Sequence, residues 1–327
     1  MTQEIIRVIS DKPDDYIRIE FMVSNVCNYK CWYCDPHAYG GDFRWTKDTD
    51  LLIENFKHLL DFYKQNGRKT VELNLLGGEP TLWPDLRKFI TALREDRDIS
   101  VTVTTNGSRT LRWWDKNAEL FDKILFSYHP TFADNKHYIN VVDLVFEKGV
   151  PCNALIMMDP KHWDKSVAMV EQCKKESKHS WFVSLMEVHS EIPYTEDQKK
   201  VFENHSVRRP NIFRAIKDEF FTIFRTTSPK VVFADGKKKS IERNWISVNG
   251  LNNFKGWMCN IGIENINIQK DGIITGTCME IPYGEDSYYN IYDSDFTSKF
   301  SPELKPVLCT KTGCYCQPEM LMNKFKI

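Results

Sequence analysis

The run IRIEFMV at residues 17–23 leads directly into a loop that contains CNYKCWYC at residues 27–34. The first run is rich in residues that favour β-strands. The second run places three of the chain's 10 cysteines, Cys27, Cys31 and Cys34, close together. We therefore predict a strand whose carboxyl end continues into a loop with three thiols.

Similar β-rich runs recur along the chain and alternate with charged segments that have helical spacing. Two of these segments are 48–67, which ends at the stop signal Gly67, and 83–96, which carries Pro84 near its start. Repeated strand–helix units imply a parallel sheet, and catalytic groups then gather at the carboxyl ends of its strands. An open six-stranded partial barrel and a doubly wound sheet both fit this pattern. The predicted strands are 17–23, 70–76, 100–105, 123–128, 150–158 and 181–188.

The pattern changes near residue 190. Segments 195–205 and 211–225 have helical patterns. Segments 230–250 and 266–278 look like hairpins, and Asp271-Gly272 is the expected turn of the second. This half of the chain also holds five further cysteines, so we expect a boundary between two kinds of structure here.

Charge and hydropathy limit the classes of partner. With 44 basic and 45 acidic residues, the net charge of -1 argues against a broad surface for nucleic acid. The first residues lack the apolar core of a secretory signal, and no run reaches the roughly 18 apolar residues that span a bilayer. We expect a soluble, cytoplasmic protein with no membrane partner, whose clustered cysteines bind metal or do chemistry.

The cysteine triplet predicts a metal site with an open position. A structural zinc normally has four closed ligands, so one interpretation is a zinc site that lacks its fourth ligand. A 4Fe–4S cluster usually has four thiolate ligands, and three cysteines would leave one of its irons open. An open iron can bind a substrate or cofactor at the edge of the sheet where such folds keep their chemistry.

The C-x3-C-x2-C spacing after the first strand, with Tyr33 before the last cysteine, resembles the signature of radical S-adenosylmethionine (SAM) enzymes. A second element is LLGGEP at residues 75–80, which follows the second strand where that family carries its GGEP motif. The resemblance implies that these glycines approach the methionine end of SAM, and that Glu79 and backbone carbonyls receive its amino group. For this run alone, an ordinary turn into a helix is the alternative interpretation.

Two weaker matches follow the next two strands. TTNGS at 104–108 ends the third strand and FSYHP at 126–130 ends the fourth, where Ser127 would meet the ribose or carboxylate of SAM. A strand-end hydroxyl that bonds the backbone is the alternative for Ser127. The resemblance therefore assigns cofactor binding to Tyr33, Gly77, Gly78, Glu79, Pro80, Thr105, Asn106 and Ser127.

The resemblance covers residues 16–190 and implies the fold and the chemistry of that part. The expected fold is α/β, a partial (β/α)6 barrel followed by a small α+β domain with hairpins. A 4Fe–4S cluster on the three cysteines, reduced by a flavodoxin or ferredoxin, would cleave SAM to a 5′-deoxyadenosyl radical that takes hydrogen from substrate. The expected parts are an N-terminal extension (1–15), the barrel (16–190), connecting helices and a hairpin (191–250), and a C-terminal domain (251–327).

The C-terminal cysteines predict a second centre. Cys259 and Cys278 flank a hairpin, which resembles the opening of the auxiliary-cluster domains called SPASM and twitch. CTKTGCYC at 309–316 adds Cys309, Cys314 and Cys316. Four of these five residues would hold one auxiliary 4Fe–4S cluster, although the C-x4-C-x-C ending departs from the C-x2-C pattern. A zinc knuckle is the alternative. Cys152 and Cys173 are expected to be buried and structural.

The substrate side is less specific in the sequence. His129, Glu187 and His189 are candidate catalytic residues, and Asn153 and Asp159 share a face of the fifth strand; for each, a structural hydrogen bond is the alternative. Only about sixteen residues precede the first strand, so we expect no leader-peptide clamp. The leading function is oxidation or rearrangement of a small molecule. The alternatives are maturation of a peptide or protein side chain and, from other classes, an iron–sulfur electron carrier or a zinc-stabilised binding protein.

Overall fold

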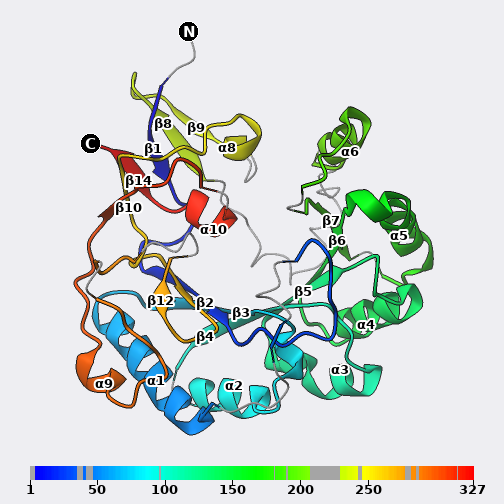
Figure 1. The fold of residues 1–327 in the computed structure, drawn as a ribbon, viewed down its shortest axis with the longest axis horizontal. Coiled ribbons are helices and arrows are strands. Elements are labelled where there is room, and N and C mark those ends of the chain that lie inside the picture. The colour runs from blue at the N-terminus through cyan, green and yellow to red at the C-terminus, as the bar shows by residue number, and fades with distance from the viewer. Residues whose placement is uncertain are drawn as a thin grey trace.

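Two β-sheets organise the chain in the computed structural model (Figure 1). The larger has the order β12-β11-β2-β3-β4-β5-β6-β7 and the smaller β13-β10-β14-β1-β8-β9. The structure describes residues 4–34, 40–41, 47–95, 97–179, 181–188, 191–206, 229–241, 245–276, 281–284, 287–314 and 316–327.

Six parallel strands form the centre of the larger sheet. They run in sequence order, each paired with the next, whereas a doubly wound sheet would reverse that order. The curved, open sheet is therefore the partial barrel, and all six predicted strands are confirmed (Figure 1). The strands are β2 (Tyr16–Met22), β3 (Thr70–Leu76), β4 (Ile99–Thr105), β5 (Lys123–Tyr128), β6 (Cys152–Met157) and β7 (Phe182–Met186).

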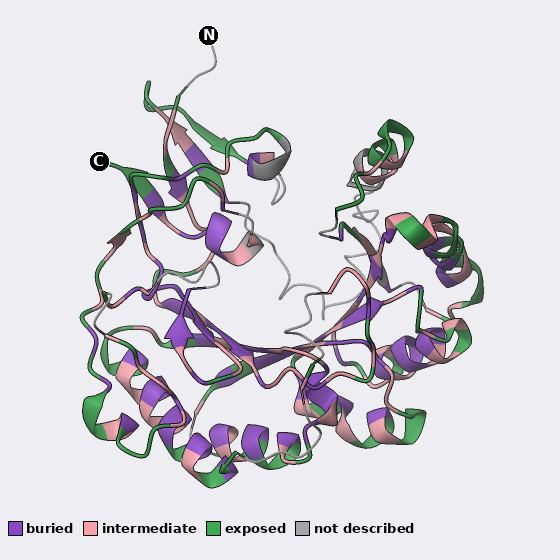
Figure 2. Ribbon diagram, in the orientation of Figure 1, coloured by how far each residue is buried: buried purple, intermediate pink, exposed green. Residues whose placement is uncertain are grey.

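Helices cover the outer face of this sheet and bury their inner sides against it (Figure 2). Phe21 of β2, Phe56 of α1 and Phe89 of α2 have no exposed surface and pack ring against ring at 4.9–5.8 Å. Burial of such a ring contributes about 1.5–3 kcal/mol. The helices are α1 (Thr49–Gln65), α2 (Leu86–Arg94), α3 (Leu111–Asn117), α4 (Asn135–Glu147) and α5 (Trp163–Glu176), with 3-10 turns η2 (Pro80–Leu82), η3 (Ala118–Leu120) and η4 (Pro160–His162).

The second predicted hairpin extends the barrel sheet. Its first strand, β11 (Asn265–Ile268), pairs in parallel with β2, and β12 (Ile274–Thr275) pairs with β11 in antiparallel orientation. Ile266 and Ile268 join the core between sheet and helices. The hairpin thus covers the edge of β2, which a six-stranded sheet would leave unpaired. The sequence pattern did not predict this pairing.

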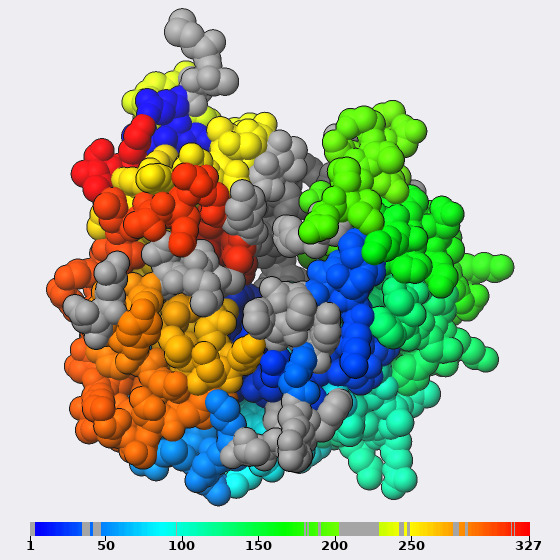
Figure 3. Space-filling view, in the orientation of Figure 1, coloured from blue at the N-terminus to red at the C-terminus, as the bar shows by residue number. Residues whose placement is uncertain are grey.

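The smaller sheet joins the two ends of the chain. β1 (Ile5–Ile9) lies between β14 (Lys324–Lys326) and β8 (Lys230–Phe233), so the first residues belong to this sheet (Figure 3). β8 and β9 (Lys238–Ser240) confirm the first part of the predicted hairpin, but Trp245–Val248 form the short helix α8. The remaining elements are β10 (Trp257–Cys259), β13 (Val307–Leu308), α9 (Phe296–Lys299) and α10 (Gln317–Met320).

The connecting region is described only in part. Helix α6 (Glu196–Ser206) confirms the helix predicted over 195–205, whereas the helix predicted over 211–225 lies outside the described residues. Within the described ranges, no helix is both long and apolar enough to cross a membrane.

Candidate active site

The GGEP turn and the start of the cysteine loop are joined by backbone hydrogen bonds. The N–H of Gly78 donates to the carbonyl of Ser24 at 2.9 Å, and that of Glu79 donates to the carbonyl of Val26 at 2.7 Å. Gly77 has a φ of 132°, and a Cβ there would lie 2.4 Å from the Ser24 carbonyl oxygen. Only glycine fits this position. The two motifs therefore form one connected unit at the carboxyl edge of the sheet.

Glu79 joins this unit to the end of β4. Its carboxylate has no exposed surface and accepts hydrogen bonds from the Thr81 N–H and hydroxyl, from the Thr105 hydroxyl at 2.7 Å and from the Asn106 N–H at 2.7 Å. Burial raises the pKa of Glu79, and these donors oppose that shift. A carboxylate offers about four acceptor sites, and the four donors can fill them. Glu79 thus positions the GGEP turn against two other predicted cofactor residues.

The three cysteines of the loop are not joined in disulfides. Cys31 is buried, and Cys27 and Cys34 are half-buried. Burial raises the pKa of Cys27 to about 11, and the Cys34 thiol together with burial raises the pKa of Cys31. Both shifts favour the protonated thiols of Cys27 and Cys31, so a metal centre that binds these two residues would release protons. Three soft sulfur donors on one loop fit a 4Fe–4S cluster with an open iron.

His129, a candidate for substrate chemistry, lies against the cysteine loop. Its Nδ1 is 2.8 Å from the hydroxyl oxygen of Tyr33 and 3.4 Å from the sulfur of Cys31. The His129 ring stacks on Tyr33 at 5.9 Å. Burial lowers the pKa of His129 to about 4, so its imidazole is neutral at physiological pH. These contacts indicate that His129 supports the cysteine loop.

Asp159 holds the loop from the other side. It has no exposed surface and accepts the Trp32 indole N–H at 3.0 Å, while His162 Nδ1 lies 2.7 Å away. The Lys161 ammonium lies 3.8 Å from the centre of the Trp32 ring. The sequence singled out Asp159 but missed Trp32 as its partner. The two lie 127 residues apart, so no local pattern indicated the contact.

The remaining substrate candidates are more scattered. Ser127 is buried at the end of β5, and the Asn153 amide donates to the Ser184 hydroxyl at 3.2 Å on the same side of the sheet. Glu187 is exposed beyond β7. His189 lies outside the described residues.

Three of the five C-terminal cysteines line one small cavity. Cys259, Cys309 and Cys314 surround about 30 Å³ together with Lys324. The Lys324 ammonium lies 3.3 Å from the Cys259 sulfur, although only 2% of this residue is exposed. The sequence missed this buried cation. Cys316 follows the cavity at the start of α10, and Cys278 lies outside the described residues.

The described cysteines of the two groups do not form a ready-made site for a single ion. Among the residues that the structure describes, no three His, Cys, Asp or Glu side chains gather closely enough to hold one metal ion. Cys173 is buried in the main core as predicted, whereas Cys152 on β6 is only half-buried.

Comparison with known proteins agrees with this arrangement. Residues 21–173 match the sequence model of the Radical SAM superfamily. This part of the chain belongs to that superfamily, as the resemblance of its cysteine and GGEP motifs predicted.

Curated relatives match over about half of the chain. The GTP 3',8-cyclase of Yersinia pestis is 27% identical in an alignment 187 residues long, and the match covers 53% of this chain and 55% of the relative. The GTP 3',8-cyclase of Klebsiella pneumoniae (strain 342) is 27% identical over 189 residues, with the same coverage. The match thus spans only about half the length of these relatives.

Solved structures share the fold over more of the chain. Native anSMEcpe with bound AdoMet has a TM-score of 0.52 at 16% identity and covers 88% of this chain and 80% of its own. The same protein with bound AdoMet and Cp18Cys peptide has a TM-score of 0.51 at 17% identity, with 87% and 80% covered. At this identity the similarity concerns the fold alone.

Proposed function

We propose that this enzyme reductively cleaves SAM at a 4Fe–4S cluster on Cys27, Cys31 and Cys34 and then oxidises a polar small molecule. The observation that carries the proposal is the connected unit of cysteine loop, GGEP turn and β4 end, joined through Glu79. Cys27, Cys31 and Cys34 would hold the cluster, which when bound would supply the electron for reductive cleavage of SAM.

The chain's own residues prepare the cofactor site. The Gly77–Gly78 backbone provides carbonyls for the SAM amino group, and Glu79 fixes their orientation. Ser127 and Asn106, both buried, offer polar groups for the rest of the cofactor. Neutral His129 and Tyr33 support the cysteine loop. Such a preorganised, water-poor site would protect a reactive radical.

The inner face of the barrel supports a polar substrate. Along the barrel strands apolar residues alternate with polar ones, and the apolar residues pack against the helices. The polar residues between them, such as Asn74 and Asn267, therefore face the barrel interior. Both are buried, and their side-chain carbonyls lack a hydrogen-bond partner among the described residues. Such groups normally find one, and hydroxyl or amine groups of a substrate would satisfy them.

The C-terminal cysteines suit the second half of an oxidation. Removal of one hydrogen atom leaves a substrate radical, which must lose one further electron and a proton to reach a closed-shell product. We assign that electron to an auxiliary 4Fe–4S cluster on Cys259, Cys309, Cys314 and either Cys278 or Cys316. Full ligation by four thiolates would leave electron transfer as the role of that cluster.

The test is an anaerobic screen of polar small molecules, above all polyols and amino acids, with SAM and dithionite. We expect one compound to yield a product lighter by two hydrogen atoms, together with 5′-deoxyadenosine. Modification only of a peptide presented by a second protein would contradict the small-molecule proposal.

A peptide substrate is the second candidate. It is favoured by the similar fold of anSMEcpe, whose structure contains both AdoMet and a Cp18Cys peptide. The same screen separates the two if it includes short peptides. A mass change confined to peptides would establish the second candidate and exclude the first.

A further inference from the structure

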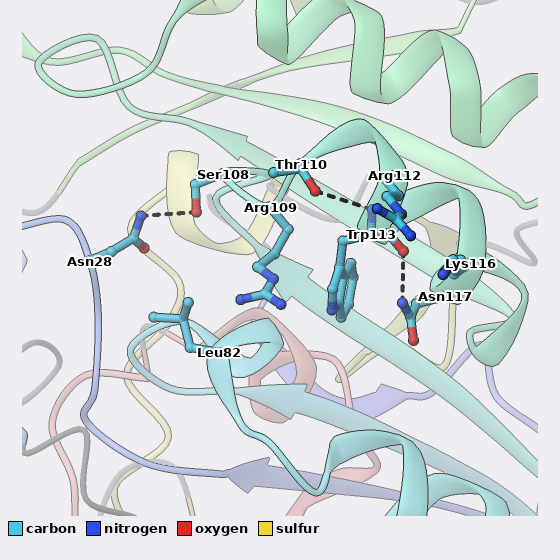
Figure 4. Close-up of a pocket in the computed structure, with 9 residues that line it drawn as sticks. All are labelled: Asn28, Leu82, Ser108, Arg109, Thr110, Arg112, Trp113, Lys116 and Asn117. Atoms are coloured by element: carbon cyan, nitrogen blue, oxygen red, sulfur yellow. Dashed lines mark hydrogen bonds between the residues drawn. The ribbon is translucent and has the colours of Figure 1, made fainter.

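A cationic groove opens beside the cysteine loop, on the outer side of the barrel (Figure 4). It has a volume of about 460 Å³ and lies between the η2 turn, the loop after β4 and helix α3. Leu82 forms one side of it, and Trp113 lies beside the Arg109 guanidinium, 5.2 Å from it. Helix α3 belongs to the layer of helices that covers the outer face of the sheet, so the groove borders that side.

The charge of this groove is one-sided. Arg109, Arg112 and Lys116 line it, and no lining residue is acidic among those that the structure describes. Arg112 and Lys116 are exposed. The one acidic residue within α3, Asp115, forms an ion pair with Lys148 at 3.2 Å. Among the described residues, no carboxylate lines the groove to neutralise its positive charge. This charge is therefore available to an anionic partner.

The groove also touches the cysteine loop. Asn28, which follows Cys27, donates to the Ser108 hydroxyl at 3.0 Å and forms part of the groove wall (Figure 4). The amide of Asn106 donates to Asn28 at 3.0 Å and lies 3.9 Å from the Cys27 sulfur. A redox group bound in the groove would thus be separated from a thiolate ligand by one or two side chains.

We propose that this groove docks the acidic, low-potential electron-carrier protein that reduces the cluster. The proposal rests on the cluster assignment of the previous subsection. In each encounter the carrier loses one electron and the cluster gains one, with no other change in bonding. In the proposed function SAM and substrate would occupy the inner side of the barrel, which leaves the outer side, where the groove lies, open to the electron carrier. Attraction between opposite charges would speed such encounters and weaken with added salt.

The test compares two reductants on one enzyme. The groove variant Arg109→Glu/Arg112→Glu/Lys116→Glu is matched with Lys136→Glu/Lys165→Glu/Lys175→Glu, which reverses three exposed charges on α4 and α5. Formation of 5′-deoxyadenosine is driven either by dithionite or by a reduced flavodoxin of net negative charge. Iron content and thermal midpoint serve as checks of folding.

We expect both variants to match the wild type with dithionite. With flavodoxin, the groove variant should need about tenfold or more donor for half-maximal rate, and its salt dependence should weaken, whereas the control should change little. If the groove variant does not fold, the neutral variant Arg109→Gln/Arg112→Gln/Lys116→Gln should show a smaller change in the same direction.

Two results would overturn the docking proposal. One is an equal flavodoxin response in the groove and control variants. The other is competition of inorganic phosphate with flavodoxin at constant ionic strength, which would identify a site for small anions. A wild type that forms no 5′-deoxyadenosine with dithionite would instead refute the proposed function itself, so the two failures are distinguishable.

Discussion

Glu79 joins two chain segments, the GGEP turn and the end of β4, through one buried carboxylate. We predict that Glu79→Ala weakens SAM binding about tenfold or more and leaves the iron content unchanged. The buried donors would lose their acceptor, and a hydrogen bond to a charged group is worth about 1.5–3 kcal/mol. Equilibrium binding of SAM to the reconstituted enzyme measures the effect. The control Thr81→Val removes only one donor to Glu79 and should therefore lower the affinity for SAM less. An unchanged affinity would contradict this role.

Glu72, near the amino-terminal end of the barrel, makes a pH-dependent contribution to the stability of the fold. Burial alone would raise its pKa, but Arg18 at 2.7 Å and Lys12 at 3.3 Å lower the pKa of Glu72 to about 2. The stabilisation is therefore present above the ordinary pKa of 4.5 and is lost as pH falls toward 2. At about 1.4 kcal/mol per pKa unit it amounts to about 3 kcal/mol.

The variant Glu72→Gln tests this contribution. We expect it to be less stable than the wild type at pH 7 and to lose less stability between pH 5 and pH 3. Urea unfolding midpoints at these pH values provide the measurement. Parallel pH profiles of the two proteins would show that Glu72 is not the group responsible.

Lys324 is a buried cation beside a proposed cluster ligand, Cys259. We predict that Lys324→Met lowers the reduction potential of the auxiliary cluster, because a positive charge nearby favours the reduced, more negative form. A redox titration followed by electron paramagnetic resonance gives the potential. If the potential is unchanged while the iron content is retained, the Lys324 charge does not act on this cluster.

At the scale of elements, the GGEP turn depends on a backbone that only glycine allows. We predict that Gly77→Ala abolishes measurable SAM binding, because its Cβ would collide with the Ser24 carbonyl. Gly236→Ala is the matched control, since Gly236 also has a positive φ of 82° but no atom within 4 Å of an added Cβ. The control should cost about 1 kcal/mol of stability and bind SAM normally. Equal SAM binding by the two variants would contradict the claim that the Gly77 turn needs its close contact with the Ser24 carbonyl.

Local pattern predicted the strands of the barrel because each is a short β-rich run bounded by helical segments. It could not predict the pairing of β11 with β2, since residues about 245 positions apart meet there. The same limit applies to the site. The cysteine and GGEP motifs are local and were found, whereas the contacts Trp32–Asp159 and Tyr33–His129 join distant segments.

At the scale of the whole molecule, the two sheets divide the proposed chemistry. The larger sheet brings the cysteine loop, the GGEP turn and the ends of β4 and β5 to one edge. The smaller sheet carries Cys259 on β10 and joins β1 to the C-terminal strand β14. This arrangement suits an enzyme that starts a radical at one centre and removes an electron at another.

Iron content and 5′-deoxyadenosine, measured together after anaerobic reconstitution, test the central claim most directly. The comparison needs the wild type, the variant Cys27→Ala/Cys31→Ala/Cys34→Ala and the control Cys152→Ala, which alters a half-buried cysteine of β6. We predict about eight irons and 5′-deoxyadenosine formation in the wild type and the control. The triple variant should keep about four irons and form none. Cleavage of SAM by the triple variant would contradict the account.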